Sequence, residues 1–533
     1  MFIRKKGPRQ LRLDEPILHE SAHKRPVTRR DFIAQGLMTG PAILAGQTLL
    51  GLMANPRVAR ALSPDLKELK TNLCSITAGA GKIPFIAFDL AGGASMVGSE
   101  ALIGGRGGPL DLLSTAGYAK LGLPGDMVPQ TATNDFIDQS LGLPWHSDGA
   151  MLRGILEKTS PTTQANTNGV VIAARSENDT GNNPHNPMYG IYKAGADGQL
   201  LTLIGSRNTE SGGNSMAPAS MIDPSVRPTK VDRASDVTGL VDTGELGTLF
   251  GTGEQARQDA VAVLEAMTRL SHRKADRFLN SLPPDRQDEI DRLFRCGYVK
   301  ATYLAQEFSD PSALNPDGDP LIVDQPGAPG TGIFSEAEYR ADEEFRKTAA
   351  VMKMVINGYA GAGTITMGGY DYHGQGRATG EVRNLRAGRC IGACLEYAAR
   401  RNKPVMIYIF SDGSLSANGQ VDNSVDGRGK FMWASDNQST AASILLVYSP
   451  QGRPEALRQQ IGWFTSDGSV DTTSHPGANS VNLLVELVIL NYMALHGEAG
   501  QFPNRFPNHG LGNVQLRDSL IAFAPIVNGT ISS

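Results

Sequence analysis

Residues 364–374 read T-I-T-M-G-G-Y-D-Y-H-G, an apolar run followed by two glycines and then by Asp371 and His373. Such apolar, β-branched runs indicate a buried strand of a parallel sheet. The pair Gly368-Gly369 allows a sharp turn beyond the strand. Because ligands of open α/β sheets bind at the carboxyl ends of strands, the segment predicts both a core strand and the beginning of a site.

The side chains of Asp371 and His373 suit a divalent metal, because carboxylate and imidazole are common zinc ligands. A turn aspartate followed by a surface histidine would give the same letters, and this alternative stays open. The sequence therefore offers zinc as a candidate cofactor.

Two more apolar runs end in an aspartate close to glycine. Residues 404–410 lead into Ser411-Asp412-Gly413, and residues 83–88 lead into Asp89, which is followed by Gly92-Gly93. Asp-Gly pairs are also ordinary turn residues. Three such strand ends favour a shared site over three unrelated turns, so we expect Asp89, Asp371 and Asp412 to lie together.

Strands alternate with helices along the chain. Candidate strands are 83–88, 169–174, 364–367, 404–410 and 441–448, and candidate helices are 62–73, 336–356, 383–401 and 481–495. This alternation predicts an α/β fold with a doubly wound, mostly parallel sheet flanked by helices. The periodic span 254–308 predicts a helical insertion, and residues 311–332 predict a Pro/Gly-rich loop.

Length and charge divide the chain into two parts. Residues 1–61 carry 11 Lys/Arg and four Asp/Glu, whereas the remaining residues carry 39 and 50, so a basic leader precedes an acidic body. An acidic body argues against a general nucleic-acid binder. At 533 residues the chain has room for two domains, and we assign residues 62–533 to one large α/β domain.

The leader predicts export. The segment T-R-R-D-F-I at 28–33 matches the twin-arginine pattern, residues 32–54 are mildly apolar, and Ala59-Arg60-Ala61 offers a cleavage site. A spanning helix is the alternative, but Gly, Pro and Gln interrupt a segment that would need about 20 mostly apolar residues. We expect a periplasmic or extracellular protein without a stable membrane span once the leader is removed.

The cysteines and the loops give few further indications of a functional site. The four cysteines are too few for a disulfide framework and too scattered for a cysteine-based zinc site, so we expect buried small hydrophobic residues at 74, 296, 390 and 394. The glycine-rich segment 92–109 lacks the Lys-Ser/Thr of a phosphate-binding P-loop. The polar segment 175–186, which contains His185, either lines a pocket or forms a solvated turn.

The order of these motifs resembles the domain-of-unknown-function family 1501, within the alkaline-phosphatase and sulfatase superfamily. The resemblance covers most of residues 28–500. It rests on the twin-arginine leader, the glycine turn after the first strand, the segment H-N-P-M-Y at 185–189, G-G-Y-D-Y-H at 368–373, Ser411-Asp412, Asp436-Asn437 and the helix at 481–495.

The resemblance implies an alkaline-phosphatase-like fold with one or two divalent metals, and hydrolysis of a small phosphate or sulfate ester, including glycan-type esters, by a Ser or Thr nucleophile. Carried over by position, the implied metal ligands are Asp371, His373, Asp412, Asp89 and Asp436. The implied catalytic residues are Ser99 as nominal nucleophile, Ser95 as its alternative, and His185 in the pocket.

The chain departs from the family pattern at several positions. Gly98 precedes the nominal nucleophile where the family has Asn or Asp, and Asp412 is shorter than the usual Glu. Gly-Ser-Leu at 413–415 replaces Phe-Gly-Arg, and Asn437 replaces a histidine. We expect His475 to be a surface residue, with replacement of that histidine by its imidazole as the alternative. Two functions therefore stay open: an exported metal-dependent hydrolase with a weakened site, or a non-catalytic envelope protein that binds or assembles with partners.

Overall fold

The computed structural model describes residues 63–69, 81–176, 183–241, 254–279, 311–374 and 376–531, with 287, 291, 295–297, 299 and 302–303. A sheet of eight strands, in the order β12-β4-β11-β8-β1-β7-β5-β6, forms its centre. The strands are β1 (Phe85–Leu90), β4 (Thr167–Ile172), β5 (Leu201–Gly205), β6 (Thr229–Lys230), β7 (Ala360–Met367), β8 (Val405–Phe410), β11 (Ser443–Tyr448) and β12 (Gln460–Ile461). Only β11 among them is antiparallel to its neighbours, so the sheet is mostly parallel.

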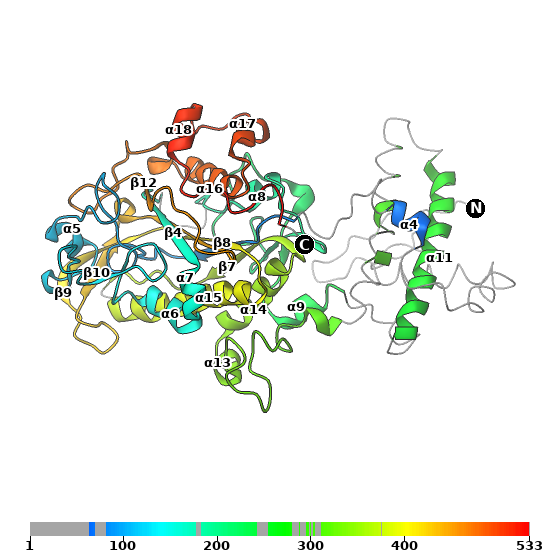
Figure 1. The fold of residues 1–533 in the computed structure, drawn as a ribbon, viewed down its shortest axis with the longest axis horizontal. Helices are drawn as coiled ribbons and strands as arrows, with labels where there is room; N and C mark the ends of the chain where they lie inside the picture. The colour runs from blue at the N-terminus through cyan, green and yellow to red at the C-terminus, as the bar shows by residue number, and fades with distance from the viewer. Residues whose placement is uncertain are drawn as a thin grey trace, which may run out of the picture.

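Helices cover both faces of this sheet (Figure 1). One layer contains α6 (Ala150–Lys158), α7 (Pro161–Ala165), α14 (Glu343–Ile356) and α15 (Arg377–Arg400); the other contains α8 (Met188–Lys193), α16 (Val481–Leu495), α17 (Phe502–Arg505) and α18 (Val514–Ser519). Shorter helices are α5 (Thr115–Lys120), α9 (Ala234–Thr238) and α13 (Glu336–Ala341). The predicted α/β fold with a mostly parallel sheet flanked by helices is confirmed.

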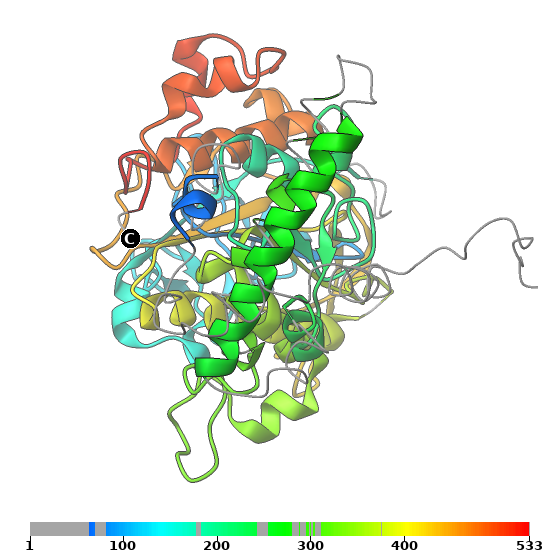
Figure 2. The same cartoon turned by 90° about the vertical axis from the view of Figure 1, so that its right-hand side faces the viewer.

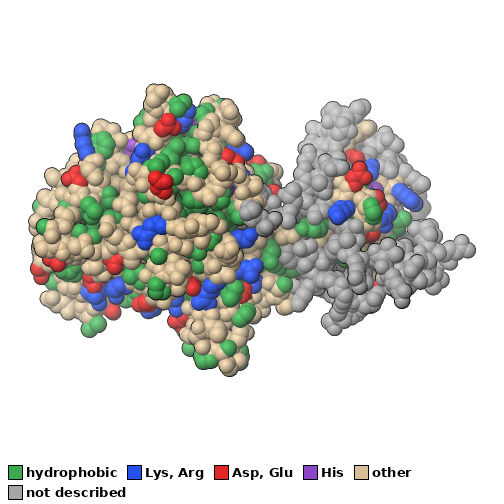
Figure 3. Space-filling model, viewed as in Figure 1, with side chains coloured by type: hydrophobic (Ala, Val, Ile, Leu, Met, Phe, Trp, Pro, Cys, Tyr) green, Lys and Arg blue, Asp and Glu red, His purple; other side chains and the backbone are tan. Residues whose placement is uncertain are grey.

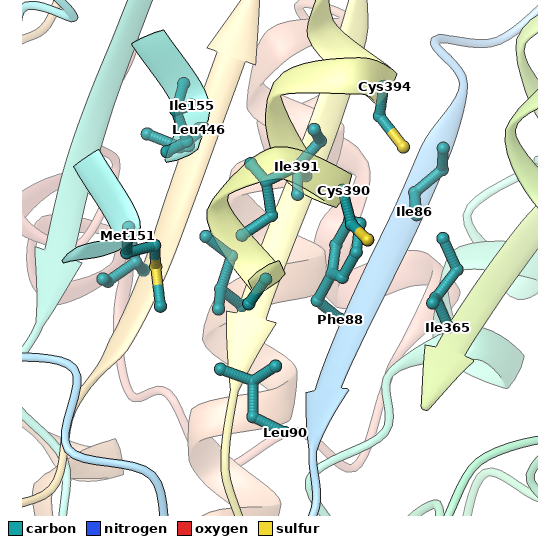
Figure 4. Packing of buried hydrophobic residues seen from close by; sticks show 14 of the residues in the cluster. Ile86, Phe88, Leu90, Met151, Ile155, Ile365, Cys390, Ile391, Cys394 and Leu446 are labelled. Atoms are coloured by element: carbon teal, nitrogen blue, oxygen red, sulfur yellow. The ribbon is translucent and has the colours of Figure 1, made fainter. Parts of the chain in front are cut away.

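Strand β1 shows why the core strands are continuous apolar runs. Ile86, Phe88 and Leu90 pack into the core under α15, as Figure 4 shows. Phe85 and Ala87 face the opposite core, under α16. A strand buried on both faces loses the polar alternation of a half-exposed strand, because neither face meets water.

Several predicted boundaries differ from the structure. β1 extends to Leu90, so Asp89 lies inside the strand and not after it. The single predicted helix at 336–356 is two helices, because the carboxylate of Asp342 caps the beginning of α14 through the Glu344 N–H. Predicted helix 481–495 matches α16 at both ends.

Three core strands and two hairpins were not predicted. The hairpins pair β9 (Leu415–Val421) with β10 (Phe431–Asp436), and β2 (Ile137–Asp138) with β3 (Trp145–His146). Strands β6 and β12 have two residues each, which is too short for a readable period. β9 is exposed along most of its length and carries polar residues, so no apolar run marks it.

The predicted insertion at 254–308 contains α11 (Glu254–Leu279). Figures 1 and 2 show α4 (Pro64–Glu68) beside α11, away from the sheet. Arg269 of α11 bonds Asp65 of α4, with Nε and Oδ2 3.0 Å apart. Most of 280–310 and all of the leader at 1–61 lie outside the described residues, whereas the predicted helix at 62–73 is described over 63–69, which contains α4. The predicted loop at 311–332 contains one short 3-10 helix, Pro311–Leu314.

The cysteine prediction holds for two residues and is wrong for a third. Cys390 and Cys394 are buried free thiols, and burial raises the pKa of Cys390 to about 12. Cys296, in contrast, is disulfide-bonded. Cys74 lies outside the described residues. The error arose because linear spacing does not show which distant cysteines the fold brings together.

The charge of the surface and the apolarity of the helices both bear on the partners that the protein could have. Figure 3 shows acidic and basic side chains interspersed over the face that it presents. No helix in the described segments combines the length and the apolarity that crossing a membrane requires.

Candidate functional site

The end of β7 places Asp371 and His373 at the surface. Tyr370 and Tyr372 alternate with them and are buried, at 0% and 3% exposure, so the intervening side chains turn outward. The Tyr372 hydroxyl accepts a hydrogen bond from the Ser95 N–H at 2.9 Å. This alternation fixes the direction of both candidate ligands relative to the core.

The carboxylate of Asp436, at the end of β10, joins this pair. His373 Nδ1 contacts Asp371 Oδ1 and lies 3.5 Å from Asp436 Oδ1. One ligand atom from each residue lies within 4.8 Å of the other two. We call Asp371, His373 and Asp436 the surface triad; all three side chains are about half exposed, at 57%, 44% and 48%.

The surface triad is a group of side chains that could hold a metal ion. Catalytic zinc sites commonly have three protein ligands of nitrogen and oxygen, with the remaining position left to water or substrate. Two carboxylates and one imidazole supply such a set, and their exposure leaves one side open to solvent. Among the described residues this is the one group of this kind, and no ligand identifies the ion.

Asp89 and Asp412 do not join the surface triad but form a buried acid pair. Both are 0% exposed. Asp89 Oδ2 accepts hydrogen bonds from the backbone N–H groups of Asn214, at 2.6 Å, and Ser215, at 2.8 Å. Asp412 Oδ1 accepts one from the Gly92 N–H at 2.7 Å. The expected single cluster is thus divided between the surface and the interior.

Burial controls the ionisation of Asp89. Together with the neighbouring Asp412 carboxylate, and against the hydrogen bonds from Ser215 and Asn214, burial raises the pKa of Asp89 to about 6. Asp89 is therefore close to protonation under mildly acidic conditions.

Asn214 connects the two carboxylates and was missed in the sequence. Its Nδ2 donates to Asp412 Oδ2 at 3.3 Å, while its backbone N–H bonds Asp89. The available signal was the polar, glycine-rich segment 212–215 that follows β5. Because β5 itself was not predicted, nothing placed that segment at the site.

Gly92 separates the surface triad from the buried acid pair. Its N–H bonds Asp412, and a Cβ at this position would lie 2.4 Å from the backbone nitrogen of Asp371. Its φ of +124° also favours glycine. The two groups therefore lie on either side of one glycine.

The predicted nucleophiles are buried. Ser99 is 1% exposed, and its hydroxyl has no hydrogen-bond partner among the described residues. Ser95 is also 1% exposed, and its backbone carbonyl accepts from Asn384 Nδ2 at 3.1 Å. Neither hydroxyl bonds a residue of the surface triad, so their nucleophilic role stays a prediction.

His185 is a buried imidazole without a hydrogen-bond partner. It is 2% exposed and stacks on Phe410, with ring centroids 5.6 Å apart. Neither ring nitrogen bonds another described group, and burial lowers the pKa of His185 to about 3. The ring is therefore neutral at physiological pH.

Asn437 and His475 each have a structural role. Asn437 Oδ1 accepts hydrogen bonds from the Ser439 N–H, at 3.0 Å, and from the Ser439 hydroxyl, at 2.6 Å. His475 is buried, at 6% exposure, and both ring nitrogens bond backbone groups of Ala173 and Gly477. The prediction that His475 is a surface residue is wrong, and its ring is not available to replace a ligand.

Comparison with known proteins gives no further assignment: no protein-family model matches the chain, and no curated protein matches it. The resemblance to family 1501 stays a prediction. The functional proposal therefore rests on the geometry and chemistry of the surface triad.

Proposed function

We propose that this chain is an exported, divalent-cation-dependent hydrolase of phosphate or sulfate esters. The observation that carries the proposal is the surface triad, which combines three ligands from two separate elements with an open side. A bound divalent cation would polarise an ester oxygen and acidify water.

The residues around the triad would position it. The buried rings of Tyr370 and Tyr372 hold the segment that presents Asp371 and His373. Asp371 Oδ1, in contact with His373 Nδ1, orients the imidazole. The open side of the triad is where substrate would approach.

The test compares metal content and ester hydrolysis in the wild type, His373→Ala and Asp436→Asn. An aryl phosphate and an aryl sulfate serve as substrates, and Asp126→Asn, an exposed aspartate elsewhere, serves as control. We expect zinc binding and hydrolysis in the wild type and the control, and loss of both in the two triad variants. Equal zinc content in all four proteins would contradict the proposed ligands.

A second function is favoured by the buried hydroxyl of Ser99, which has no hydrogen-bond partner among the described residues. On this alternative the chain binds a cation without catalysing hydrolysis and serves in the cell envelope as a binding protein. Zinc bound in stoichiometric amount, with no hydrolysis of either ester, would favour this alternative.

A further inference from the structure

A separate cleft opens at the carboxyl ends of β5 and β7. Its volume is about 710 Å³, within the range of small-molecule sites, and its lining does not include the surface triad. Ser206 and Gly368, which follow the two strands, form part of its wall. We call it the β5–β7 cleft.

Basic side chains outnumber acidic ones in this cleft. The basic residues are Arg207, Lys230, Lys347, Arg383 and Arg386, and the acidic residues are Asp232, Glu343 and Glu344. Lys230 pairs with Asp232 at 2.8 Å, and Lys347 pairs with Glu344 at 2.7 Å. The three guanidinium groups therefore face Glu343 as the remaining lining carboxylate, and the lining keeps an excess of positive charge.

These arginines retain hydrogen-bonding capacity. Arg383 Nη1 donates to the Gly368 carbonyl at 3.1 Å, and Arg386 Nη1 lies 3.8 Å from Asp342. The Nε atoms of Arg383 and Arg386 are buried and have no hydrogen-bond partner among the described residues. Buried, unpaired N–H groups are costly, and an oxyanion is the acceptor that a guanidinium fork binds best.

Two glycines shape the cleft around Arg383. A Cβ at Gly369, where φ is +83°, would lie 2.4 Å from Arg383 Nη1. Only a residue without a side chain lets the guanidinium pack against the backbone here. A Cβ at Gly368 would meet nothing within 4 Å, so the adjacent space is open.

We propose that the β5–β7 cleft binds the phosphate or sulfate group of a small organic anion, with Arg383 as the principal donor and Arg207 and Arg386 beside it. The volume is larger than an inorganic oxyanion needs, which leaves room for an organic part. This site does not rest on the function proposed for the surface triad, and it needs no metal.

The test is isothermal titration of the full chain with inorganic phosphate, inorganic sulfate, glucose 6-phosphate and glucose, all in EDTA. Arg383→Gln removes the principal charge, and Gly368→Leu fills the open space while keeping every arginine. Arg389→Gln is the matched control, because Arg389 lies on the same helix but pairs with Glu157 and does not line the cleft.

We expect saturable binding of at least one inorganic oxyanion to the wild type, tighter binding of glucose 6-phosphate, and no binding of glucose. Arg383→Gln and Gly368→Leu should each weaken binding about tenfold or more, and Arg389→Gln should leave it unchanged.

The proposal is overturned if the wild type binds no oxyanion saturably, or if Arg383→Gln and Arg389→Gln bind equally. Should Arg383→Gln fail to fold, unchanged affinity in Gly368→Leu overturns it. Equal affinity for phosphate and glucose 6-phosphate would overturn the claim that the cleft also binds the organic part of the ligand. Because EDTA is present throughout, failure of the metal proposal does not affect these outcomes.

Discussion

Gly92 lies between the surface triad and the buried acid pair, because its N–H bonds Asp412 and its backbone packs against Asp371. Alanine at this position would strain the backbone and push against Asp371 N, whereas alanine at Gly419, with φ of +81° and open space, meets only the strain. We expect Gly92→Ala to lower the free energy of unfolding by about 3 kcal/mol and Gly419→Ala by about 1 kcal/mol. Urea denaturation measures both, and equal losses would show that the close contact is unimportant.

His185 should make the protein sensitive to acid. Burial lowers its pKa from 6.5 to about 3, so below pH 6.5 the unfolded chain binds a proton that the native state does not. Its contribution to stability is complete above pH 6.5 and is lost as the pH falls toward 3.

Replacing the imidazole by a phenyl ring tests this prediction, because phenylalanine keeps the stack on Phe410 and cannot titrate. Between pH 7 and pH 4.5 we expect His185→Phe to lose roughly 2 kcal/mol less unfolding free energy than the wild type. Denaturant unfolding at the two pH values provides the measurement. Parallel losses in both proteins would contradict the prediction.

Among the elements, the long core strands were predictable and their polar neighbours were not. β8 is apolar throughout and β7 is mostly apolar because both faces of each strand are buried, and that pattern is visible in the letters alone. Beyond β7, which ends at Met367, buried Tyr370 and Tyr372 alternate with exposed Asp371 and His373. Asn214 reaches its position through the order of strands in the sheet, and Asp436 through the packing of its hairpin. Spacing along the sequence reveals neither of these. The resemblance alone suggested Asp436.

The β9–β10 hairpin, which carries Asp436, is anchored through a buried lysine. Lys430 is 0% exposed, and its Nζ donates to Glu381 Oε1 at 2.9 Å and to the Asp148 carbonyl at 2.8 Å. Removing Lys430 takes one cation from Glu381, which Arg377 also pairs at 2.7 Å, and leaves the Asp148 carbonyl without this donor.

We expect Lys430→Met to lower the free energy of unfolding by about 3 kcal/mol. Lys120→Met is the control, because Lys120 is 25% exposed and lies 3.4 Å from an exposed carboxylate, so its loss should cost no more than about 1 kcal/mol. Thermal and urea unfolding of the two variants test the difference. If the hairpin positions Asp436, Lys430→Met should also bind zinc more weakly. An unchanged free energy of unfolding in Lys430→Met would exclude the anchoring role of Lys430.

For the molecule as a whole, the proposed export draws on the charge of the leader and on the state of Cys296. The basic leader precedes an acidic body. Cys296 is disulfide-bonded, and disulfides persist in oxidising compartments such as the periplasm.

Export and the state of Cys296 should therefore change together. Replacing Arg29 and Arg30 with lysine should retain the precursor in the cytoplasm, because the twin-arginine signal requires that pair. The retained protein should carry Cys296 as a reduced thiol, since cytoplasmic thiols are kept reduced. Cell fractionation and maleimide labelling, followed by peptide mass spectrometry, measure both properties.

The control replaces Arg9 and Arg12 with lysine, which keeps the leader's charge and leaves the motif intact, so this variant should be exported and oxidised. Periplasmic, oxidised protein in the Arg29/Arg30 variant would contradict the route, and reduced Cys296 in exported wild type would contradict the disulfide.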